Sequence, residues 1–468
     1  MHLKKNDSKI ASYYKMRKGK IVMKKRFLVL SMVFIILVSM LTGCGSQQSS
    51  QTPPAPTGGK TDGVGEFQSR NIKFLSIWPE DDKNANGWLI SELSRQYGET
   101  VDAFNLEYEY VSIDQLDQKV KILISSDDLP EVCTYESGVR LKQVIEADKI
   151  LNVDKTFSDL GIRDCLDEGA VSLLKNLVDG LGLYCVPLGM NMEGFWYNKA
   201  LFAEAGVAKV PETWDEMLDA CEKLKAKGII PIVQGGSDNW PMTRVLNAYV
   251  VRSIGLDALQ NAVTGKTHFS DPEYVAAAQM FQDMAKKGYF AEGMNTIDPG
   301  TATSMLMNGQ AAMNYDGSWK SSNLNSEDNT AGPEGIGFFN VPVVNDSSTL
   351  RDYSMNCGNI LMFSSKKYDE QVGEWMKFVF PMLGDFAIQE TGSFKGFRIT
   401  EMPEDTTYYT QLVADNLANA ENAFLWFEAK MDSETSTLAQ NLISLLYTGD
   451  ISAEDYMRAL EETAAKSR

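Results

Sequence analysis

The segment Thr213–Val233 constrains the fold most, because it predicts a capped helix followed at once by a buried strand. Thr213 and Glu216 have the spacing of a capping box, in which each side chain accepts a hydrogen bond from a backbone amide at the helix start. Gly228 ends the helix, and Ile229–Val233 has the composition of a buried strand. Apolar residues recur at helical spacing along one face, namely Trp214, Met217, Leu218, Cys221 and Leu224.

The chain on both sides of this segment continues the alternation of strands and helices. Because strands and helices follow one another in turn, we expect an α/β fold whose sheets are mostly parallel. A second capping box is predicted from the spacing of Ser270 and Glu273. The predicted elements are strands at Asn71–Trp78, Leu106–Val111 and Glu131–Tyr135, and helices at Trp88–Tyr97, 114–124, Met242–Arg252, 271–287 and Glu370–Phe380.

The N-terminal region has the three-part layout of a secretory signal peptide. Lys24–Arg26 precede an apolar run from Phe27 to Leu41, and small residues lead into Cys44. The apolar run, at roughly 15 residues, is shorter than the ~20 that a transmembrane helix needs. We therefore expect residues 1–43 to be a signal peptide, with translation starting at Met1 or Met23. An uncleaved N-terminal anchor is the alternative.

Residues 44–66 differ in composition from the rest of the chain, because Ser, Gln, Pro, Thr and Gly dominate them. A segment of this kind cannot bury a core, so we expect a flexible tether.

The charge and the histidine content exclude several classes of function. The formal net charge is −19. Ten of the 44 basic residues but only one of the 63 acidic residues precede Cys44, so the rest of the chain carries a net charge of −28. This charge argues against a nucleic-acid-binding protein, which needs a basic footprint, and against broad contact with an anionic membrane. His2 precedes the signal and His268 stands alone, so the sequence does not predict a nucleophile–histidine active site.

Five cysteines follow Cys44, and neither their number nor their spacing indicates a disulfide framework or a zinc site. One disulfide among them is an open alternative. We expect no metal and no cofactor. The five are Cys133, Cys165, Cys185, Cys221 and Cys357.

The segment Leu183–Val233 resembles the family 1 extracellular solute-binding proteins, the maltose-binding-protein-like lipoprotein receptors of carbohydrate ABC importers. Met305–Trp319 resembles the same family through its helix, Asn-Gly, strand and Gly-x-Trp turn. The matching residues in the first segment are Pro187, Tyr197-Asn198-Lys199, Leu201-Phe202, Ala205-Gly206, Pro211, Thr213–Glu216 and Gly228–Pro231.

The resemblance implies a two-lobed periplasmic-binding-protein-like fold, each lobe a mostly parallel sheet flanked by helices. The chain would cross between the lobes three times, near Pro187, Val341 and Thr400. The N-terminal lobe would comprise residues 67–186 with 343–399, and the C-terminal lobe residues 187–342 with 400–468.

The resemblance also implies a receptor and not an enzyme. Such a receptor binds a sugar or oligosaccharide between its lobes and delivers it to the permease subunits of an ABC importer, without a cofactor. The Leu-Thr-Gly-Cys ending looks like a lipobox, so the family implies a diacylglyceryl group on Cys44. The protein would then be a monomer anchored by lipid to the outer face of the bacterial plasma membrane.

Sugar rings stack on aromatic side chains, and their hydroxyls bond to carboxylates, amides and Arg; such polar groups converge in concave sites between domains. By resemblance, ligand contacts follow the first and third strands, lie in Asn191–Glu193 and Gly236–Trp240, and occur at the Gly-x-Trp turn. For each aromatic residue, packing in the core is the alternative. The candidate residues are Trp78, Glu80, Asp81, Tyr135, Glu136, Asn191, Glu193, Asp238, Trp240, Asp316 and Trp319, with Asn356 as a further candidate.

Two other functions stay open. One is a receptor for a non-sugar solute such as a peptide, a polyol or a glycerol phosphate. A phosphate ligand would favour a site rich in Arg and Lys, whereas the loops that carry the candidate residues are rich in acids. The other is a surface glycosidase, which needs only two carboxylates of the candidate set.

Overall fold

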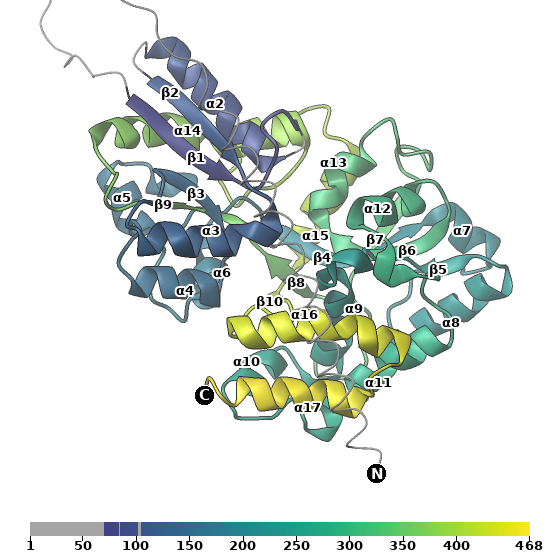
Figure 1. Ribbon diagram of the computed structural model, residues 1–468. Helices are drawn as coiled ribbons and strands as arrows, with labels where there is room; N and C mark the ends of the chain where they lie inside the picture. The colour runs from purple at the N-terminus through teal and green to yellow at the C-terminus, as the bar shows by residue number, and fades with distance from the viewer. Residues whose placement is uncertain (1–69, 84, 102–103) are drawn as a thin grey trace, which may run out of the picture. The chain divides into compact units, whose positions relative to one another are not determined.

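The computed structural model describes residues 70–83, 85–101 and 104–468, which belong to one compact unit, Phe67–Arg468 (Figure 1). The predicted signal peptide, the tether and the lipidation site Cys44 lie outside the described residues. Within the described part, no helix has the length and apolar character needed to cross a membrane.

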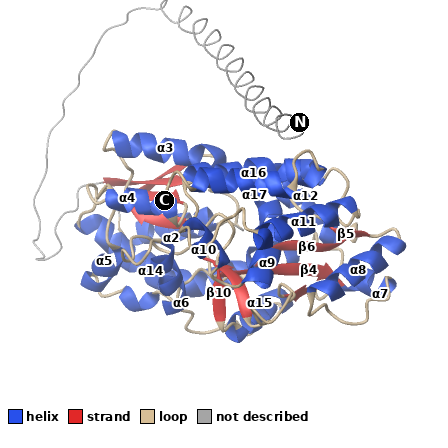
Figure 2. Ribbon diagram, turned by 90° about the horizontal axis from the view of Figure 1, so that it is seen from below, coloured by secondary structure: helices blue, strands red, loops and turns tan. Residues whose placement is uncertain are grey.

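The described unit contains two sheets with helices packed around each, seen as red strands between blue helices in Figure 2. The first sheet has the strand order β2-β1-β3-β9, and its strands are parallel except for β9. This lobe confirms the predicted parallel α/β arrangement. Its strands are β1 (Arg70–Ser76), β2 (Phe104–Tyr110), β3 (Val132–Tyr135) and β9 (Ile360–Phe363), and its helices are α2 (Asn86–Thr100), α3 (Ile113–Ser125), α4 (Val139–Glu146), α5 (Val153–Asp159), η1 (Arg163–Cys165), α6 (Glu168–Leu177) and α14 (Glu370–Thr391).

The second sheet has the strand order β10-β8-β4-β6-β5, and β7 also pairs with β4. The central strand β4 runs antiparallel to β6, β7 and β8, whereas β5 is parallel to β6 and β10 to β8. The prediction of a mostly parallel sheet is therefore wrong for this lobe. The strands are β4 (Asn191–Asn198), β5 (Ile230–Ile232), β6 (Ala311–Gly317), β7 (Ile336–Phe339), β8 (Asp352–Asn356) and β10 (Asn422–Phe424).

The sequence did not reveal β4 as a strand because nearly all of its residues are buried, so apolar and polar positions do not alternate along it. Its antiparallel partners come from segments more than a hundred residues away, and local sequence patterns do not report such pairing. The helices around this sheet are α7 (Lys199–Glu204), α8 (Trp214–Ala226), η2 (Gly236–Asp238), α9 (Trp240–Ile254), α10 (Ala258–Val263), α11 (Pro272–Lys286), η3 (Met294–Thr296), α12 (Pro299–Met307), η4 (Ser318–Lys320), α13 (Ser321–Leu324), α15 (Tyr408–Asn419), α16 (Ser433–Thr448) and α17 (Ala453–Ala464).

The capping box of α8 is confirmed. Thr213 Oγ1 accepts from the Glu216 amide at 3.3 Å, and the Glu216 carboxylate accepts from the Thr213 amide at 3.3 Å. The capping box predicted from Ser270 and Glu273 is wrong. Asp271 stands at the N-cap of α11, and its carboxylate turns back to accept from the His268 amide at 2.8 Å.

The sequence predicts that the chain returns to the N-terminal lobe just after Val341, but the structure places this return later. β8 pairs with β4 in the second sheet, with Asn356 opposite Asn191, and the chain joins the first sheet only at β9. A bridge between Val186 and Leu361 places the chain just before Pro187 beside β9. All five described cysteines are free, so the alternative of a disulfide among them is not borne out.

Candidate functional site

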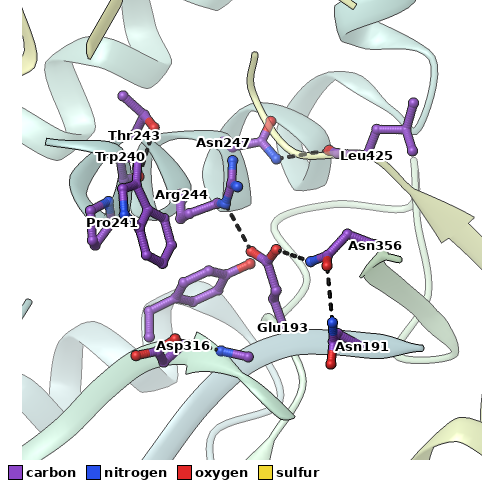
Figure 3. A network of polar contacts seen from close by, with 12 residues as sticks. Asn191, Glu193, Trp240, Pro241, Thr243, Arg244, Asn247, Asp316, Asn356 and Leu425 are labelled. Carbon is purple, nitrogen blue, oxygen red and sulfur yellow. Dashed lines mark hydrogen bonds and ion pairs between the residues drawn. The ribbon is translucent and has the colours of Figure 1, made fainter. Parts of the chain in front are cut away.

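Polar side chains from β4 and β8 form the base of a buried network in the second lobe (Figure 3). Asn191 Nδ2 donates to Asn356 Oδ1 at 3.2 Å, and Asn356 Nδ2 donates to Glu193 Oε1 at 2.6 Å. The pairing of Asn191 with Asn356 across the two strands brings these side chains together. Asn356 thus links two candidate residues of β4, from more than 160 positions away in the sequence, in one connected chain of hydrogen bonds.

Arg244 on α9 completes this network, and the sequence analysis did not identify it. Its Nε lies 3.2 Å from Glu193 Oε2, and its Nη1 lies 3.0 Å from Glu428 Oε2. Thr243 Oγ1 donates to the other oxygen of Glu428 at 2.5 Å. The side chains of Glu193 and Glu428 are 1% and 4% exposed, and that of Arg244 is 12% exposed, so the carboxylates lie beneath the guanidinium.

The contact between Glu193 and Arg244 is an ion pair without hydrogen-bond geometry, because Glu193 Oε2 and Arg244 Nε have no hydrogen-bond partner. Burial raises the pKa of Glu193; the charge of Arg244 opposes this rise, and the nearby Asp316 adds to it. The network therefore holds Arg244 by charge and position.

Two indoles flank Arg244, and a third packs against one of them. The guanidinium carbon lies 5.4 Å from the centroid of the Trp240 ring and 5.5 Å from that of Trp426, within the range of cation–π contacts. Trp319 meets Trp240 edge to face, with 6.2 Å between ring centroids. All three indoles are partly exposed, so they offer apolar surface beside the Arg244 donors.

Gly317 determines how Trp319 lies. A Cβ atom at residue 317 would stand 2.1 to 2.3 Å from carbons of the Trp319 ring, so the indole folds back over the bare Cα. The Gly317 backbone is extended, with φ −94° and ψ 167°, so the glycine is needed for space and not for its conformation.

The start of α9, which carries Trp240, is held by buried and strained residues. Gln234 Nε2 donates to Pro241 O at 2.9 Å and to Tyr315 O at 2.8 Å, which joins the helix start to β6. Asn239 adopts φ +65°, unusual for a residue other than glycine, and its Oδ1 accepts from Ser444 Oγ at 2.7 Å.

Of the remaining candidates of the second lobe, Asp316 lies near Glu193, and Asp238 ends η2, just before α9. The Asp316 carboxylate forms an ion pair with Lys320 at 3.3 Å, and the Asp316 side chain is 7% exposed. Asp238 is exposed and accepts from Ser237 Oγ at 2.9 Å. Lys320 and Arg244 are thus both already paired with carboxylates.

The candidates of the first lobe follow β1 and β3. Tyr135 is buried and donates to Asp117 at 2.7 Å, and Glu136 forms an ion pair with Arg140 at 2.6 Å. Burial raises the pKa of Glu136; the charge of Arg140 opposes this rise, and the charges of Asp117 and Glu428 add to it. Trp78 is half-buried and Glu80 and Asp81 are exposed, with Glu80 accepting from Ser91 Oγ at 2.7 Å.

The paired carboxylates around Arg244 and Arg140 are poorly placed for the chemistry of a glycosidase. A glycosidase needs two carboxylates that reach the substrate, one of them protonated to act as the acid. Glu193 and Glu428 are nearly inaccessible and paired with Arg244, and Glu136 is paired with Arg140. Among the described residues, no three His, Cys, Asp or Glu side chains are grouped so that they could hold a metal ion.

The chain resembles known binding proteins in sequence. The chain is 22% identical over 329 residues to an uncharacterized ABC transporter extracellular-binding protein of Pyrococcus horikoshii, covering 69% of this chain and 71% of the relative. It is 28% identical over 264 residues to the multiple sugar-binding protein of Streptococcus mutans, covering 54% of this chain and 60% of the relative.

Solved structures share the fold. A chitin oligosaccharide binding protein superposes with a TM-score of 0.77 at 23% identity, covering 85% of this chain and 98% of its own. The solute-binding protein RafE in complex with raffinose superposes with a TM-score of 0.66 at 18% identity, covering 84% of this chain and 99% of its own. These neighbours are two-lobed solute-binding proteins, which confirms the predicted two-lobed fold.

The family described as bacterial extracellular solute-binding protein matches residues 88–380, which is more than half of the chain. This range includes Glu193, Arg244 and most strands of both sheets, whereas β1, β10 and Glu428 lie outside it. The chain therefore belongs to the family 1 extracellular solute-binding proteins, the binding components of ABC transporters.

Proposed function

We propose that this protein is a receptor that binds a sugar or an oligosaccharide beside Arg244 and delivers it to an ABC importer. The observation that carries the proposal is the position of Arg244, held by Glu193 and Glu428 between the rings of Trp240 and Trp426. A sugar needs hydrogen-bond donors for its hydroxyls next to apolar surface for its ring faces. Arg244 and the surrounding indoles offer both.

The buried carboxylates act through Arg244. Since Glu193 and Glu428 are almost completely buried, we expect them to orient the guanidinium while Arg244 contacts the ligand. The candidates of the first lobe, Tyr135 and Glu136 among them, would meet the ligand from the other side when the lobes close. A ligand that touches both lobes only in the closed form shifts the equilibrium toward closure.

We place the protein at the cell surface. The signal peptide and Cys44 support a lipid anchor at the outer face of the plasma membrane, and the closed monomer would dock on the permease subunits. These proposals rest on the sequence motif and on family membership.

A phosphorylated ligand such as a glycerol phosphate is disfavoured by the charges at the site. Arg244, which lies over two of the indoles, and Lys320, the residue that follows Trp319, are each already paired with a carboxylate. A phosphate would have to displace these partners or lie beside them, and like charges at close range repel.

The test is a thermal-shift panel on the full chain, with raffinose, chitin oligosaccharides and sn-glycerol 3-phosphate as probes. We expect at least one sugar to raise the melting temperature, no stabilisation by the phosphate, and no release of reducing sugar during incubation. Arg244→Gln should abolish the shift, whereas Arg458→Gln, which changes an arginine paired with Asp455 on α17, should preserve it. Stabilisation by glycerol phosphate alone, or release of reducing sugar, would contradict the proposal.

A further inference from the structure

The segment Leu425–Met431, between β10 and α16, takes part in the Arg244 network through several of its residues. Leu425 O accepts from Asn247 Nδ2 at 3.0 Å, and Glu428 binds Arg244 and Thr243. Two backbone hydrogen bonds, from Ala429 N to Trp426 O at 3.0 Å and from Met431 N to Glu428 O at 3.1 Å, fold the segment into consecutive turns. The segment is thus a compact unit fixed to α9.

The same segment also contacts the first lobe. Lys430 Nζ forms an ion pair with Asp179 Oδ1 at 2.9 Å and donates to Asn176 O at the end of α6. The Lys430 side chain is only 7% exposed although it is charged. In Figures 1 and 2, α6 of the first lobe lies beside β10 of the second, which agrees with this contact.

Gly138 shows how close this approach is. A Cβ atom at residue 138 would lie 2.7 Å from Ala429 O, and the glycine also adopts φ +86°. The loop after β3, which begins with the ligand candidate Glu136, therefore lies directly against the segment that carries Glu428. One short segment connects the ion pair of Arg244 in one lobe with an ion pair of Asp179 in the other.

We propose that Lys430 is a positioning residue that sets ligand affinity without touching the ligand, because its ion pair with Asp179 holds the two lobes together. This inference rests on the proposed function and concerns how the affinity of the same site is controlled. Contacts between lobes that form only in the closed state stabilise that state, and tighter closure slows the release of a ligand held by both lobes. Lys430 and Glu428 belong to one folded segment. A ligand that fixes the positions of Arg244 and Glu428 therefore also holds Lys430 where it can pair with Asp179. By reciprocity, the Lys430–Asp179 ion pair favours the ligand-bound arrangement.

Asp179 offers a matched control within the same cluster. Its carboxylate also binds Lys142 of α4 at 3.0 Å, and this second ion pair lies within the first lobe. Burial opposes the ionisation of Asp179, but the hydrogen bonds from Lys430 and Lys142 outweigh it and lower its pKa. Lys142→Gln therefore removes a lysine from the same carboxylate without removing a contact between lobes.

The first test needs no ligand. Two spin-labelled non-natural amino acids, at the exposed Ile122 on α3 and Glu462 on α17, would report the distance between lobes in the full chain by double electron–electron resonance. Lys430→Gln and Asp179→Asn should each shift the distance distribution toward longer values. Asn is chosen at residue 179 because it tolerates the φ of +54° there. Lys142→Gln should leave the distribution unchanged.

The second test measures the dissociation rate of whichever sugar of the thermal-shift panel binds. Lys430→Gln should raise this rate on the order of 10-fold, with little change in the association rate, and Asp179→Asn should add little in the double variant. If Lys430→Gln changes neither the distance distribution nor the dissociation rate, or if Lys142→Gln has the same effect, the proposal is overturned. If no sugar binds, the proposed function fails, while the ligand-free distances still decide whether the ion pair holds the lobes together.

Discussion

Gly317→Ala is a sharp test of the site, because it moves the Trp319 ring without removing it. The new Cβ would stand 2.1 Å from the nearest ring carbon, and ordinary contact between carbons begins near 3.5 Å. The indole must therefore move by roughly 1 to 1.5 Å. Since the Gly317 backbone is extended, alanine fits it without strain, and the lost flexibility of the unfolded chain adds about 0.4–1 kcal/mol of stability.

The expected loss of affinity follows from what an anchoring indole contributes. Truncating a tryptophan that anchors a binding site typically costs at least about 2 kcal/mol, or about 30-fold in Kd. We expect Trp319→Ala to show a loss of this size. Gly317→Ala keeps the ring but misplaces it, so we expect about 1–2 kcal/mol, which is roughly 5- to 30-fold in Kd.

Isothermal titration with the sugar found in the thermal-shift panel measures both variants, and urea unfolding checks their stability. Gly98→Ala in α2 is the matched control. A Cβ atom at residue 98 would lie 3.5 Å from its nearest neighbour, Phe104 Cδ1, which is an ordinary contact distance. This change should stabilise the helix by up to about 1 kcal/mol and leave Kd unchanged. If Gly317→Ala bound sugar as tightly as the original chain, the position assigned to Trp319 in binding would be refuted.

Two further predictions concern stability. Thr213→Ala should lower the free energy of unfolding by about 1 kcal/mol, because it removes the capping box of α8, and should leave the sugar Kd unchanged; a changed Kd would show that α8 is not merely framework. Burial lowers the pKa of Lys395 to about 8 from 10.5, so the folded state binds this proton less tightly than the unfolded chain does. Lys395→Met should therefore stabilise the protein by roughly 3 kcal/mol at pH 7, and this gain should shrink as the pH rises from about 8 to 10.5. Urea unfolding at pH 7 and pH 10 checks it, and a gain that stays constant with pH would contradict it.

Local signals in the sequence were sufficient for much of the framework. The capping box at Thr213 predicted the start of α8, and the apolar spacing that follows predicted its buried face. The first three strands were found within about two residues of their observed bounds. These features depend on residues a few positions apart, which is why the sequence reports them.

The candidate site could be predicted only in part, since its key pairs join distant segments. Glu428 lies 184 residues from Arg244 in sequence, so neither residue stands in a motif with its partner. Asn191, Glu193 and Asn356 were identified by resemblance, and their connection depends on the pairing of β4 with β8, which no local pattern reveals. Arg244 could have been suspected from one signal, a charged residue within the apolar run that follows Trp240.

The most direct test of the account is a crystal structure of the protein with the panel sugar that raises its melting temperature most. We predict a sugar ring against at least one of the indoles of Trp240, Trp319 and Trp426, with a hydroxyl oxygen within about 3 Å of an Arg244 nitrogen. The carboxylates of Glu193 and Glu428 should remain beneath the guanidinium. A sugar bound elsewhere in the molecule, with Arg244 touching no part of it, would contradict the account.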